Sequence, residues 1–327
     1  MNWKKLIAML GMIVLLVSSS MNLNGCRNKH ATANLPQENG TIEVLFSQTD
    51  NCEARLEQIL NASSKIEAAL YDLDVAEIIN ILKAKSADVL VDEDNYFDYG
   101  TKISGTGLMH DKFWVLKNAS GIDYIITGSL NPTYNDLKKN DNNVLIISSK
   151  YLEKNYEAEF KELKNNEKDK PTQYQKIILN NQLIENYFCP DDNCEDKVLI
   201  ALKKANQSIY FMTFSFTSDP LGDYIISKKD KLDIKGVFDE SQANSQKQYT
   251  EYYKMLNNSM KVKLDSSKYK LHHKVFIIDN QTVITGSYNP TSSGTERNDE
   301  NILIIHDSDV AAKFMKEFER VWNTAKH

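Results

Sequence analysis

The stretch LHHKVFIIDNQTVITGSYN, residues 271–289, contains two short apolar runs that are separated by Asp-Asn-Gln. β-Branched and aromatic residues dominate both runs, and the polar break between them predicts a β-hairpin. Side chains alternate between the two faces of a strand, so His272 and Lys274 share one face while His273 takes the other. The stretch therefore places a histidine and a lysine side by side, and His273 is expected to have a structural role.

The same pattern occurs a second time, in LMHDKFWVLKNASGIDYIITGSLN at residues 108–131. His110 and Lys112 stand there in the same relation as the later pair. From Gly128 and Gly286 onward the two copies align without a gap through NPTYNDLKKNDNNVLII and NPTSSGTERNDENILII. A repeat of about 160 residues indicates a duplicated domain, not a solenoid. The chain is therefore predicted to contain two versions of one module.

The 327 residues are 41% hydrophobic and 26% charged, which is an ordinary globular composition with room for two domains. Strand and helix patterns alternate in both halves, so we expect an α/β fold with a sheet covered on both faces in each module. The expected strands are 42–46, 65–73, 87–91, 184–188, 208–216 and 232–238. The expected helices are 52–62, 75–85, 152–163, 194–206, 220–228 and 309–325. The expected divisions are a signal (1–25), a polar leader (26–40), a first module (41–164), a linker (165–176) and a second module (177–327).

The first 25 residues have the pattern of a secretory signal. Lys4 and Lys5 precede an apolar run at 6–17 that is too short to span a membrane comfortably, and three serines follow. Leu-Asn-Gly-Cys at 23–26 resembles the lipobox of bacterial lipoproteins, so three alternatives stay open: lipidation of Cys26, simple cleavage, or an uncleaved anchor. All three predict an exported protein that is extracellular, periplasmic or anchored on the outer side of the cytoplasmic membrane.

The remaining cysteines agree with export. Cys189 and Cys194 are separated by four residues and could close a disulfide in an oxidising compartment. The alternative, a metal clip, is disfavoured because no histidine lies near these two thiols. Cys52 is the repeat partner of Cys194, and Ser47 stands where Cys189 stands, so Cys52 is expected to be free and buried.

The duplicated motif is similar to the signature of the phospholipase D superfamily: H-x-K, four residues, Asp, six residues, then G-S-x-N. The later copy fits at every position, with Asp279 as the acid. In the earlier copy Lys117 replaces this acid, and four extra residues lengthen the turn. We expect that change to affect the geometry of the turn more than the chemistry. The resemblance covers both halves, roughly residues 42–322.

The two histidines suffice for the chemistry of a phosphodiester. A neutral imidazole can attack phosphorus and a second imidazole can protonate the leaving group, and histidine's usual pKa of ~6.5 allows both forms near neutral pH. No metal or other cofactor is required. The expected catalytic residues are His110, Lys112, Asn131, His272, Lys274, Asn289 and Glu300. The expected supporting residues are Gly128, Ser129, Asn142, Asp279, Gly286 and Ser287, with the two serine hydroxyls donating to the phosphoryl oxygens.

The resemblance also implies how the modules cooperate. In the superfamily two modules pack about a pseudo-twofold axis, both H-x-K pairs meet in one cleft, and a covalent phosphohistidine forms. An acid downstream of G-S-x-N orients a histidine of the opposite module. Glu300 would then support His110, whereas Asn142, at the aligned position, would leave His272 with only a neutral amide. We therefore expect His110 to be the nucleophile and His272 the general acid and base.

The substrate is less well specified. Two compact modules with short loops resemble the small bacterial and archaeal nuclease branch, which favours a nuclease acting on DNA or RNA. The net charge of −6, which becomes −8 without residues 1–25, opposes this because nucleic-acid grooves need basic residues. Alternatives are a phospholipase D or phosphatidyl transferase acting on membrane phospholipids, and an inactive nucleic-acid or phospholipid binding module. We expect a monomer that forms an intramolecular pseudo-dimer. Lysines near the motifs could offset the net charge: Lys102, Lys138, Lys139, Lys268 and Lys270.

Overall fold

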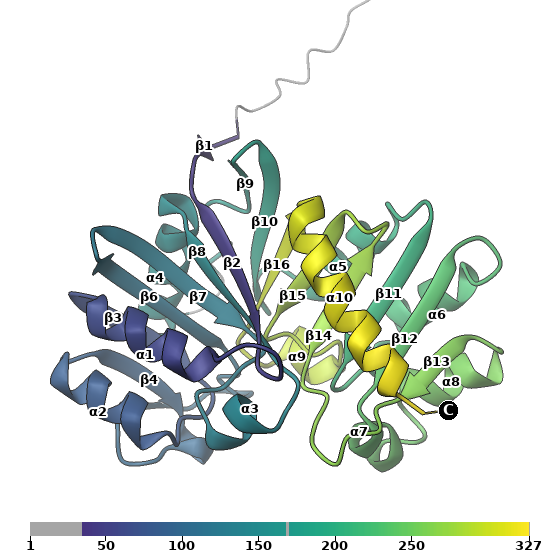
Figure 1. Ribbon diagram of the computed structural model, residues 1–327, viewed down its shortest axis with the longest axis horizontal. Helices are drawn as coiled ribbons and strands as arrows, with labels where there is room; N and C mark the ends of the chain where they lie inside the picture. Colours follow the sequence, from purple (N-terminus) through teal and green to yellow (C-terminus); the bar gives the residue numbers. More distant parts are fainter. Residues whose placement is uncertain (1–34, 168–169, 327) are drawn as a thin grey trace, which may run out of the picture. The chain divides into compact units, whose positions relative to one another are not determined.

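The computed structural model describes residues 35–167 and 170–326 (Figure 1). The predicted signal at 1–25 and the lipidation candidate Cys26 lie outside the described residues. Within the described part of the chain, no helix is both long enough and apolar enough to cross a membrane.

The first half of the chain builds a seven-stranded mixed sheet in the order β2-β8-β7-β6-β3-β4-β5. Its strands are β2 (Thr41–Phe46), β3 (Lys65–Leu70), β4 (Asp88–Asp92), β5 (Thr101–Ile103), β6 (Lys112–Ala119), β7 (Ile122–Gly128) and β8 (Asn143–Ser148). Its helices are α1 (Cys52–Ala62), α2 (Ala76–Ala84), α3 (Tyr134–Lys138) and α4 (Lys150–Asn165), with a 3-10 turn at Glu93–Asn95.

The second half builds a nine-stranded sheet in the order β1-β9-β10-β16-β15-β14-β11-β12-β13. Its strands are β1 (Gln37–Glu38), β9 (Lys176–Leu179), β10 (Gln182–Cys189), β11 (Ser208–Thr213), β12 (Asp233–Phe238), β13 (Lys261–Leu264), β14 (Lys274–Ile278), β15 (Thr282–Gly286) and β16 (Glu300–His306). Its helices are α5 (Cys194–Leu202), α6 (Asp219–Ser227), α7 (Glu240–Ser245), α8 (Glu251–Asn257), α9 (Ser292–Glu296) and α10 (Ser308–Thr324).

The predicted hairpins and the predicted α/β order are present. β14 pairs antiparallel with β15, with Phe276 opposite Ile284, and β6 pairs in the same way with β7. One boundary differs, because the predicted polar leader contains β1, which pairs parallel with β9 of the second half. A strand of two residues has no period that a sequence could reveal.

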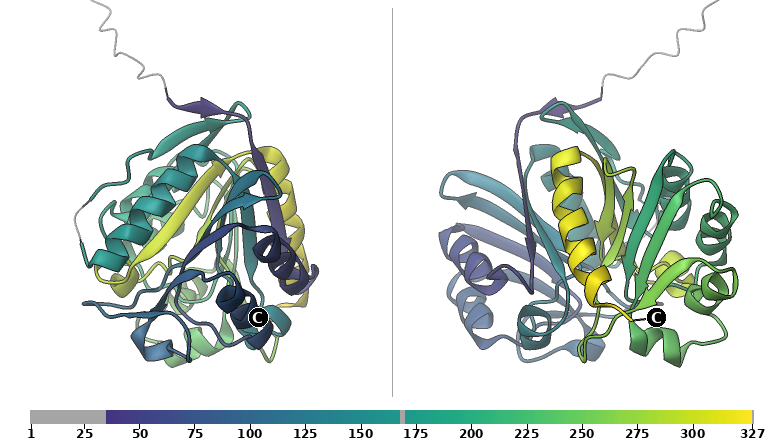
Figure 2. Two further views of the ribbon diagram at one scale, coloured as in Figure 1. Left: turned by 90° about the vertical axis from the view of Figure 1, so that its left-hand side faces the viewer. Right: turned by 45° about the vertical axis from the view of Figure 1, so that its right-hand side comes forward.

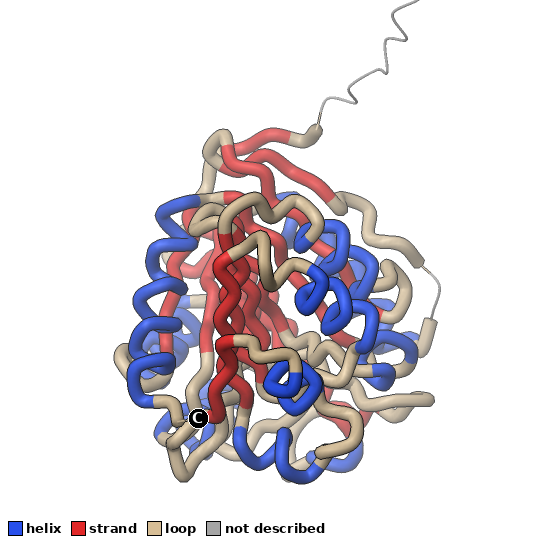
Figure 3. Tube along the Cα trace, turned by 90° about the vertical axis from the view of Figure 1, so that its right-hand side faces the viewer, coloured by secondary structure: helices blue, strands red, loops and turns tan. Residues whose placement is uncertain are grey.

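Apolar strands explain why each sheet is covered on both faces. All five residues of β14 are buried, as expected for a strand that packs against helices above and below. Helices α1 and α2 cover the outer face of the first sheet, and α5, α6 and α8 cover that of the second. The inner faces share one apolar core with α4 and α10. Figure 3 shows the strands between layers of helices, and Figure 2 shows α10 lying against the sheets.

The shared core contains contacts that are mirrored between the halves. Phe314 of α10 meets Phe46 of the first sheet with ring centroids 5.2 Å apart. At the matched positions, Tyr156 of α4 meets Phe188 of the second sheet at 5.0 Å. Each long helix therefore packs on its own sheet and on a strand of the other, as a pseudo-twofold relation requires.

The cysteines adopt the predicted states. Cys189, at the end of β10, forms a disulfide with Cys194, at the start of α5, with 5.7 Å between the two Cα atoms. Cys52 is free and buried.

Candidate active site

Both histidines of the repeated motifs line one cleft of about 430 Å³. Each is placed by the other half of the chain. The backbone N–H of His110 donates to the carbonyl of Asp299 at 3.0 Å, and that of His272 donates to the carbonyl of Asp141 at 2.9 Å. The two imidazoles, far apart in the sequence, therefore lie at a single site.

His110 is paired with Glu300, the acid that the resemblance to the superfamily implied. Its Nδ1 lies 2.8 Å from Oε2 of Glu300, and both side chains are buried. A proton shared at Nδ1 leaves Nε2 as the free nitrogen of the ring. Burial, followed by the charges of Lys112 and Lys274, lowers the pKa of His110 well below its usual value. Burial also raises the pKa of Glu300 to about 8. These shifts favour the neutral imidazole, which is the form that attacks phosphorus.

His272 has a different set of partners. Its Nδ1 lies 2.8 Å from Oδ1 of Asn142, as the cross-module alignment predicted. The same nitrogen lies 3.5 Å from Oδ2 of Asp136, which the sequence did not predict. The expectation that His272 has only a neutral amide beside it is therefore wrong. Burial and then the charge of Lys274 lower the pKa of His272 to about 3, and Asp136 opposes this shift.

Asp136 lies on α3, a helix of five residues, and is 3% exposed. Oδ2 accepts hydrogen bonds from the backbone N–H and from Nδ2 of Asn131, both at 2.8 Å, and Oδ1 accepts one from Nδ2 of Asn140 at 2.7 Å. Burial favours the neutral acid, but His272 and these donors outweigh it and hold the pKa of Asp136 below its usual range. A special role for Asp136 could have been inferred from the gapless repeat, because the first half has an acid at the position where the second half has Gly294.

The two motif lysines are buried beside the histidines, with exposures of 2% and 3%. Lys112 Nζ donates to the carbonyl of His110 at 2.6 Å, and Lys274 Nζ donates to the carbonyl of His272 at 2.8 Å. Burial lowers the pKa of Lys112 to about 8 and the pKa of Lys274 well below its usual value. Because desolvation opposes the charged form of both amines, an anion bound beside them would favour that form, and the site therefore prefers an anion.

The comparison with known proteins agrees with this geometry. The family model described as "Cardiolipin synthase, PLD-like domain" matches residues 84–164 and 198–322, which is more than half of the chain. This chain belongs to the phospholipase D superfamily. It is a phospholipase D-like phosphodiesterase, as the repeated motif predicted.

Two relatives each match less than half of this chain. "Phospholipase D" of Rickettsia typhi is 27% identical over 151 residues, 46% of this chain and 73% of that protein. "Mitochondrial cardiolipin hydrolase" of Mus musculus is 31% identical over 136 residues, 38% of this chain and 57% of that protein. The superposition on the solved phosphatidylserine synthase of Haemophilus influenzae Rd KW20 covers 87% of this chain and 87% of that one, with a TM-score of 0.67 and 13% identity. This similarity shows a shared two-module fold.

The asparagines of the phospholipase D motif, Asn131 and Asn289, both line the cleft. The adjacent serines do not, which corrects the expectation that their hydroxyls contact the phosphate. Ser129 Oγ is fully buried and donates to Oδ1 of Asn142 at 3.0 Å. Ser287 Oγ is also fully buried and accepts from the backbone N–H of Asn301 at 2.9 Å. Each hydroxyl therefore fixes a segment that carries a histidine partner. Ser129 contacts Asn142 itself, and Ser287 contacts the residue that follows Glu300.

The motif glycines and the motif acid have structural surroundings. A Cβ atom on Gly128 or Gly286 would lie 2.4 or 2.1 Å from a carbonyl oxygen of the neighbouring strand, and both have a positive φ. The carboxylate of Asp279 accepts the backbone N–H groups of residues 206–208 at 2.7–2.9 Å. At the matched position, Lys117 forms ion pairs with Glu153 and Glu157 of α4. The phospholipase D acid therefore fixes a turn in this chain.

His273 is fully buried and faces α10, away from the cleft, as strand alternation predicted. Its Nε2 lies 3.0 Å from Oε1 of Glu317, and its Nδ1 lies 3.1 Å from Nδ2 of Asn143.

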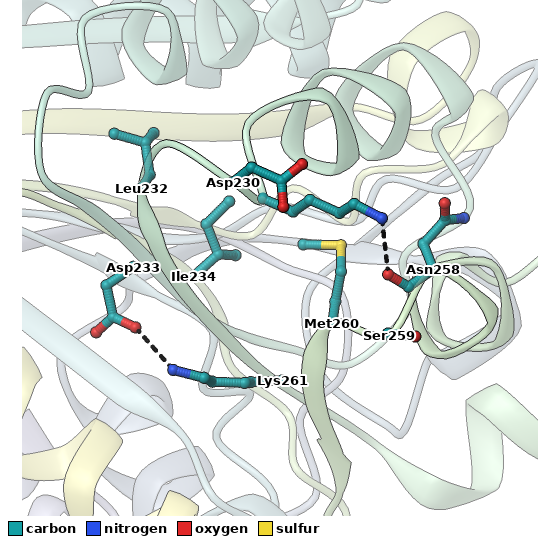
Figure 4. A pocket seen from close by; sticks show the side chains of 9 residues that line it. Asp230, Leu232, Asp233, Ile234, Asn258, Ser259, Met260 and Lys261 are labelled. Atoms are coloured by element: carbon teal, nitrogen blue, oxygen red, sulfur yellow. Dashed lines mark hydrogen bonds and ion pairs between the residues drawn. The ribbon is translucent and has the colours of Figure 1, made fainter.

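Two further features bear on other possible sites. A hollow of about 190 Å³ near β12 and β13 is lined by residues such as Ile234 and Met260, and two of its lysines are already paired, Lys261 with Asp233 and Lys229 with a carbonyl (Figure 4). Among residues 35–167 and 170–326, no group of three or more His, Cys, Asp or Glu side chains is arranged to hold a metal ion. Metal independence stays a prediction.

Proposed function

We propose that this phosphodiesterase cleaves the headgroup phosphodiester of phospholipids, by hydrolysis or by transfer to another alcohol, through a covalent phosphohistidine. The observation that carries the proposal is the single cleft lined by His110 and His272, with Lys112 and Lys274 buried behind them. One imidazole from each half of the chain thereby faces the same cleft, with one lysine of each motif close behind it.

The reaction has two steps. Nε2 of His110 forms a bond to phosphorus, the bond from phosphorus to the leaving oxygen breaks, and that oxygen takes a proton from Nε2 of His272. His272 then removes a proton from water or another alcohol, whose oxygen attacks phosphorus as the bond to His110 breaks. The lysine charges and the asparagine amides balance the charge that develops on the phosphoryl oxygens.

Charge in the cleft supports a phospholipid over a nucleic acid. Asp72 and Asp74 line the wall that the first half contributes, and the second half has Ser215 and Thr217 at the matched positions. These carboxylates would repel the second phosphate of a polynucleotide, and the net charge of −6 adds to that repulsion. The names of the matched Rickettsia and mouse proteins, a phospholipase D and a cardiolipin hydrolase, point the same way.

Three exposed aromatic rings belong to residues that are close in sequence to the lining of the cleft. Phe97, Tyr134 and Tyr269 are 63%, 58% and 38% exposed, and each lies within two residues of a residue that lines the cleft. Lys139 Nζ lies 4.8 Å from the ring centre of Tyr134 and 5.8 Å from that of Tyr269, so it bridges the two halves. Tyrosine rings beside lysines suit the interface between lipid headgroups and water.

The test is a substrate panel in EDTA. The purified protein is incubated with bis-p-nitrophenyl phosphate, with phosphatidylcholine or cardiolipin vesicles, with supercoiled plasmid and with RNA. We expect turnover of the reporter and release of lipid products, without nicking of the plasmid. The His110→Asn variant should lose all of this, whereas His306→Asn, which changes a histidine paired with Glu185 outside the cleft, should not.

Other outcomes of the panel separate the alternatives. Plasmid nicking or RNA cleavage without release of lipid products would overturn the lipid assignment and support the nuclease. Binding of nucleic acid or vesicles with no turnover of any substrate would indicate an inactive binding module.

We also propose that the protein works outside the cytoplasm. The bond between Cys189 and Cys194 supports this, because disulfides persist in oxidising compartments. Fractionation of the producing cell would test the proposal, and recovery in the cytoplasm would contradict it.

A further inference from the structure

The half-sites around the two histidines differ at two aligned positions. Where the second half has Glu300 and Gly294, the first half has Asn142 and Asp136. The acid that contacts His110 has become an amide beside His272, and a carboxylate has appeared six residues earlier in the same segment. The structure brings that carboxylate back to the histidine, 3.5 Å from its Nδ1.

Asp136 contacts both His272 and a motif asparagine. One of its oxygens, Oδ2, faces His272 and also accepts both N–H groups of Asn131 at 2.8 Å. Asn131 in turn lines the cleft, and its Oδ1 is buried without a hydrogen-bond partner among the described residues. A single carboxylate therefore fixes a histidine and an amide that both face the substrate.

Asp136 is not needed to begin its helix. The cap of α3 is Thr133, whose Oγ1 accepts the backbone N–H of Asp136. A buried carboxylate that is not a cap, and that points at a catalytic histidine, requires another explanation.

We propose that Asp136 is a positioning residue that stands in for the acid missing at position 142, stabilising the protonated ring of His272 while it orients the amide of Asn131. This inference rests on the proposed function. Beside His110, Glu300 fixes the tautomer, while burial raises its pKa to about 8 and so reduces the charge that it carries near neutral pH. In the other half-site Asn142 accepts the Nδ1 proton and Asp136 supplies a charge.

The division suits the role of His272. The ring must be positively charged before it protonates the leaving oxygen, and again after it takes a proton from water. Burial and Lys274 lower the pKa of this ring to about 3, and an anion 3.5 Å away offsets part of that shift in both of these states. The low pKa of Asp136 keeps this anion present over the whole working pH range.

The test compares Asp136→Asn with the double change Asp136→Asn, Asn142→Glu, which restores an acid at the aligned position. Lys138→Gln is the matched control, because it alters an exposed ion pair of the same helix, with Glu53, outside the cleft. Thermal melting monitored by circular dichroism verifies that each variant is folded.

The readout is how the loss of activity depends on the leaving group and on pH. Loss of Asp136 should lower kcat at least tenfold on an alkyl phosphodiester such as phosphatidylcholine. It should lower kcat much less on bis-p-nitrophenyl phosphate, whose leaving group needs no proton. The alkaline limb of the pH profile should move to lower pH by about one unit, because the ring loses a stabilising anion. The double variant should move it back.

Equal losses on both substrates, an unmoved alkaline limb, or failure of Asn142→Glu to restore activity in a folded protein would each overturn the proposal. A measurement without turnover separates this failure from failure of the proposed function. The pKa of the His272 ring, followed by NMR in the presence of inorganic phosphate, should be about one unit lower in Asp136→Asn than in the wild type. That shift is expected even if no phosphodiester is cleaved.

Discussion

The first and second halves of the chain carry the same H-x-K and G-S-x-N motifs, but the residues that complete each half-site differ. His110 is paired with the carboxyl group of Glu300 at 2.8 Å. His272 has an amide at 2.8 Å and a carboxylate at 3.5 Å. The backbone contacts that place the two rings are the same in both halves. A duplicated frame can therefore hold two identical side chains in position while their neighbours give them different hydrogen-bond partners and different charges.

The halves also differ on the side of the motif strands that faces away from the cleft. In the second half His273 and Arg320 both contact Glu317. At the positions matched to His273, Glu317 and Arg320 the first half has Asp111, Glu159 and Glu162, three acids. Burial and Asp111 raise the pKa of Glu159 well above its usual value, and burial raises the pKa of Asp111 to about 7. Glu317 thus has a cationic partner in Arg320, whereas the neighbours that act on Glu159 are acids.

The largest expected effect separates the two histidines directly. His110→Asn should lower turnover of bis-p-nitrophenyl phosphate on the order of 10⁴-fold or more and should give no phosphoenzyme. His272→Asn should still form a phosphoenzyme, because p-nitrophenolate leaves without a proton. Rapid quenching at alkaline pH, followed by peptide mass spectrometry, would locate the phosphate. Finding it on residue 272 would reverse the assignment.

The next effect concerns the partner of His110. Glu300→Gln should lower kcat about 10²-fold with little change in KM, because the nucleophile loses the group that fixes its tautomer. Steady-state kinetics on bis-p-nitrophenyl phosphate would measure this. Glu296→Gln, an exposed acid on α9, is the control and should leave both constants unchanged. A change in KM alone would show that Glu300 acts in binding.

Changing the two matched glutamates should affect stability with opposite signs. The pKa of Glu317 is lowered to about 2, by hydrogen bonds from Arg320 and His273 that outweigh burial, so its contribution is present above pH ~4.5 and is lost as pH falls toward 2. The raised pKa of Glu159 instead penalises the folded state once pH exceeds ~4.5. At pH 7.5, Glu317→Gln should cost about 2 kcal/mol of unfolding free energy, and Glu159→Gln should stabilise the protein.

Urea unfolding at several pH values would test this pair of changes. Both differences from the wild type should shrink below pH 4. Destabilisation by both variants at pH 7.5 would contradict the asymmetry.

The smallest effect concerns the turns of the two hairpins. Asp279→Ala removes the acceptor of three backbone N–H groups and should cost about 1–2 kcal/mol. Lys117→Ala removes only partly exposed ion pairs and should cost less than about 1 kcal/mol. Neither should change kcat. Loss of activity in folded Asp279→Ala would show that Asp279 contributes to catalysis.

The sequence was informative wherever a pattern was repeated or periodic. The duplicated motif predicted the two modules, and its resemblance to the phospholipase D superfamily implied the shared cleft and the contact between His110 and Glu300. The apolar runs predicted the hairpins and the long helices within a few residues. The disulfide followed from the short spacing of its cysteines.

What the sequence did not reveal depends on short elements and long-range contacts. Asp136 was missed because a five-residue helix has no clear period, and because nothing in the local sequence indicates that its side chain reaches His272. The hydroxyls of Ser129 and Ser287 were expected at the phosphate, but both meet a neighbouring strand. The direction of these two side chains is set by the sheet and not by the motif.

The mirrored contacts of α4 and α10 limit how substrates can reach the histidines. Phe314 against Phe46, and Tyr156 against Phe188, join the two sheets through rings that are almost fully inaccessible to solvent. A hinge motion that separates the two halves would break both contacts and would expose a large apolar surface to water. Entry and release therefore depend on loops at the mouth, and substitutions there can retune substrate preference while the spacing of the imidazoles stays constant.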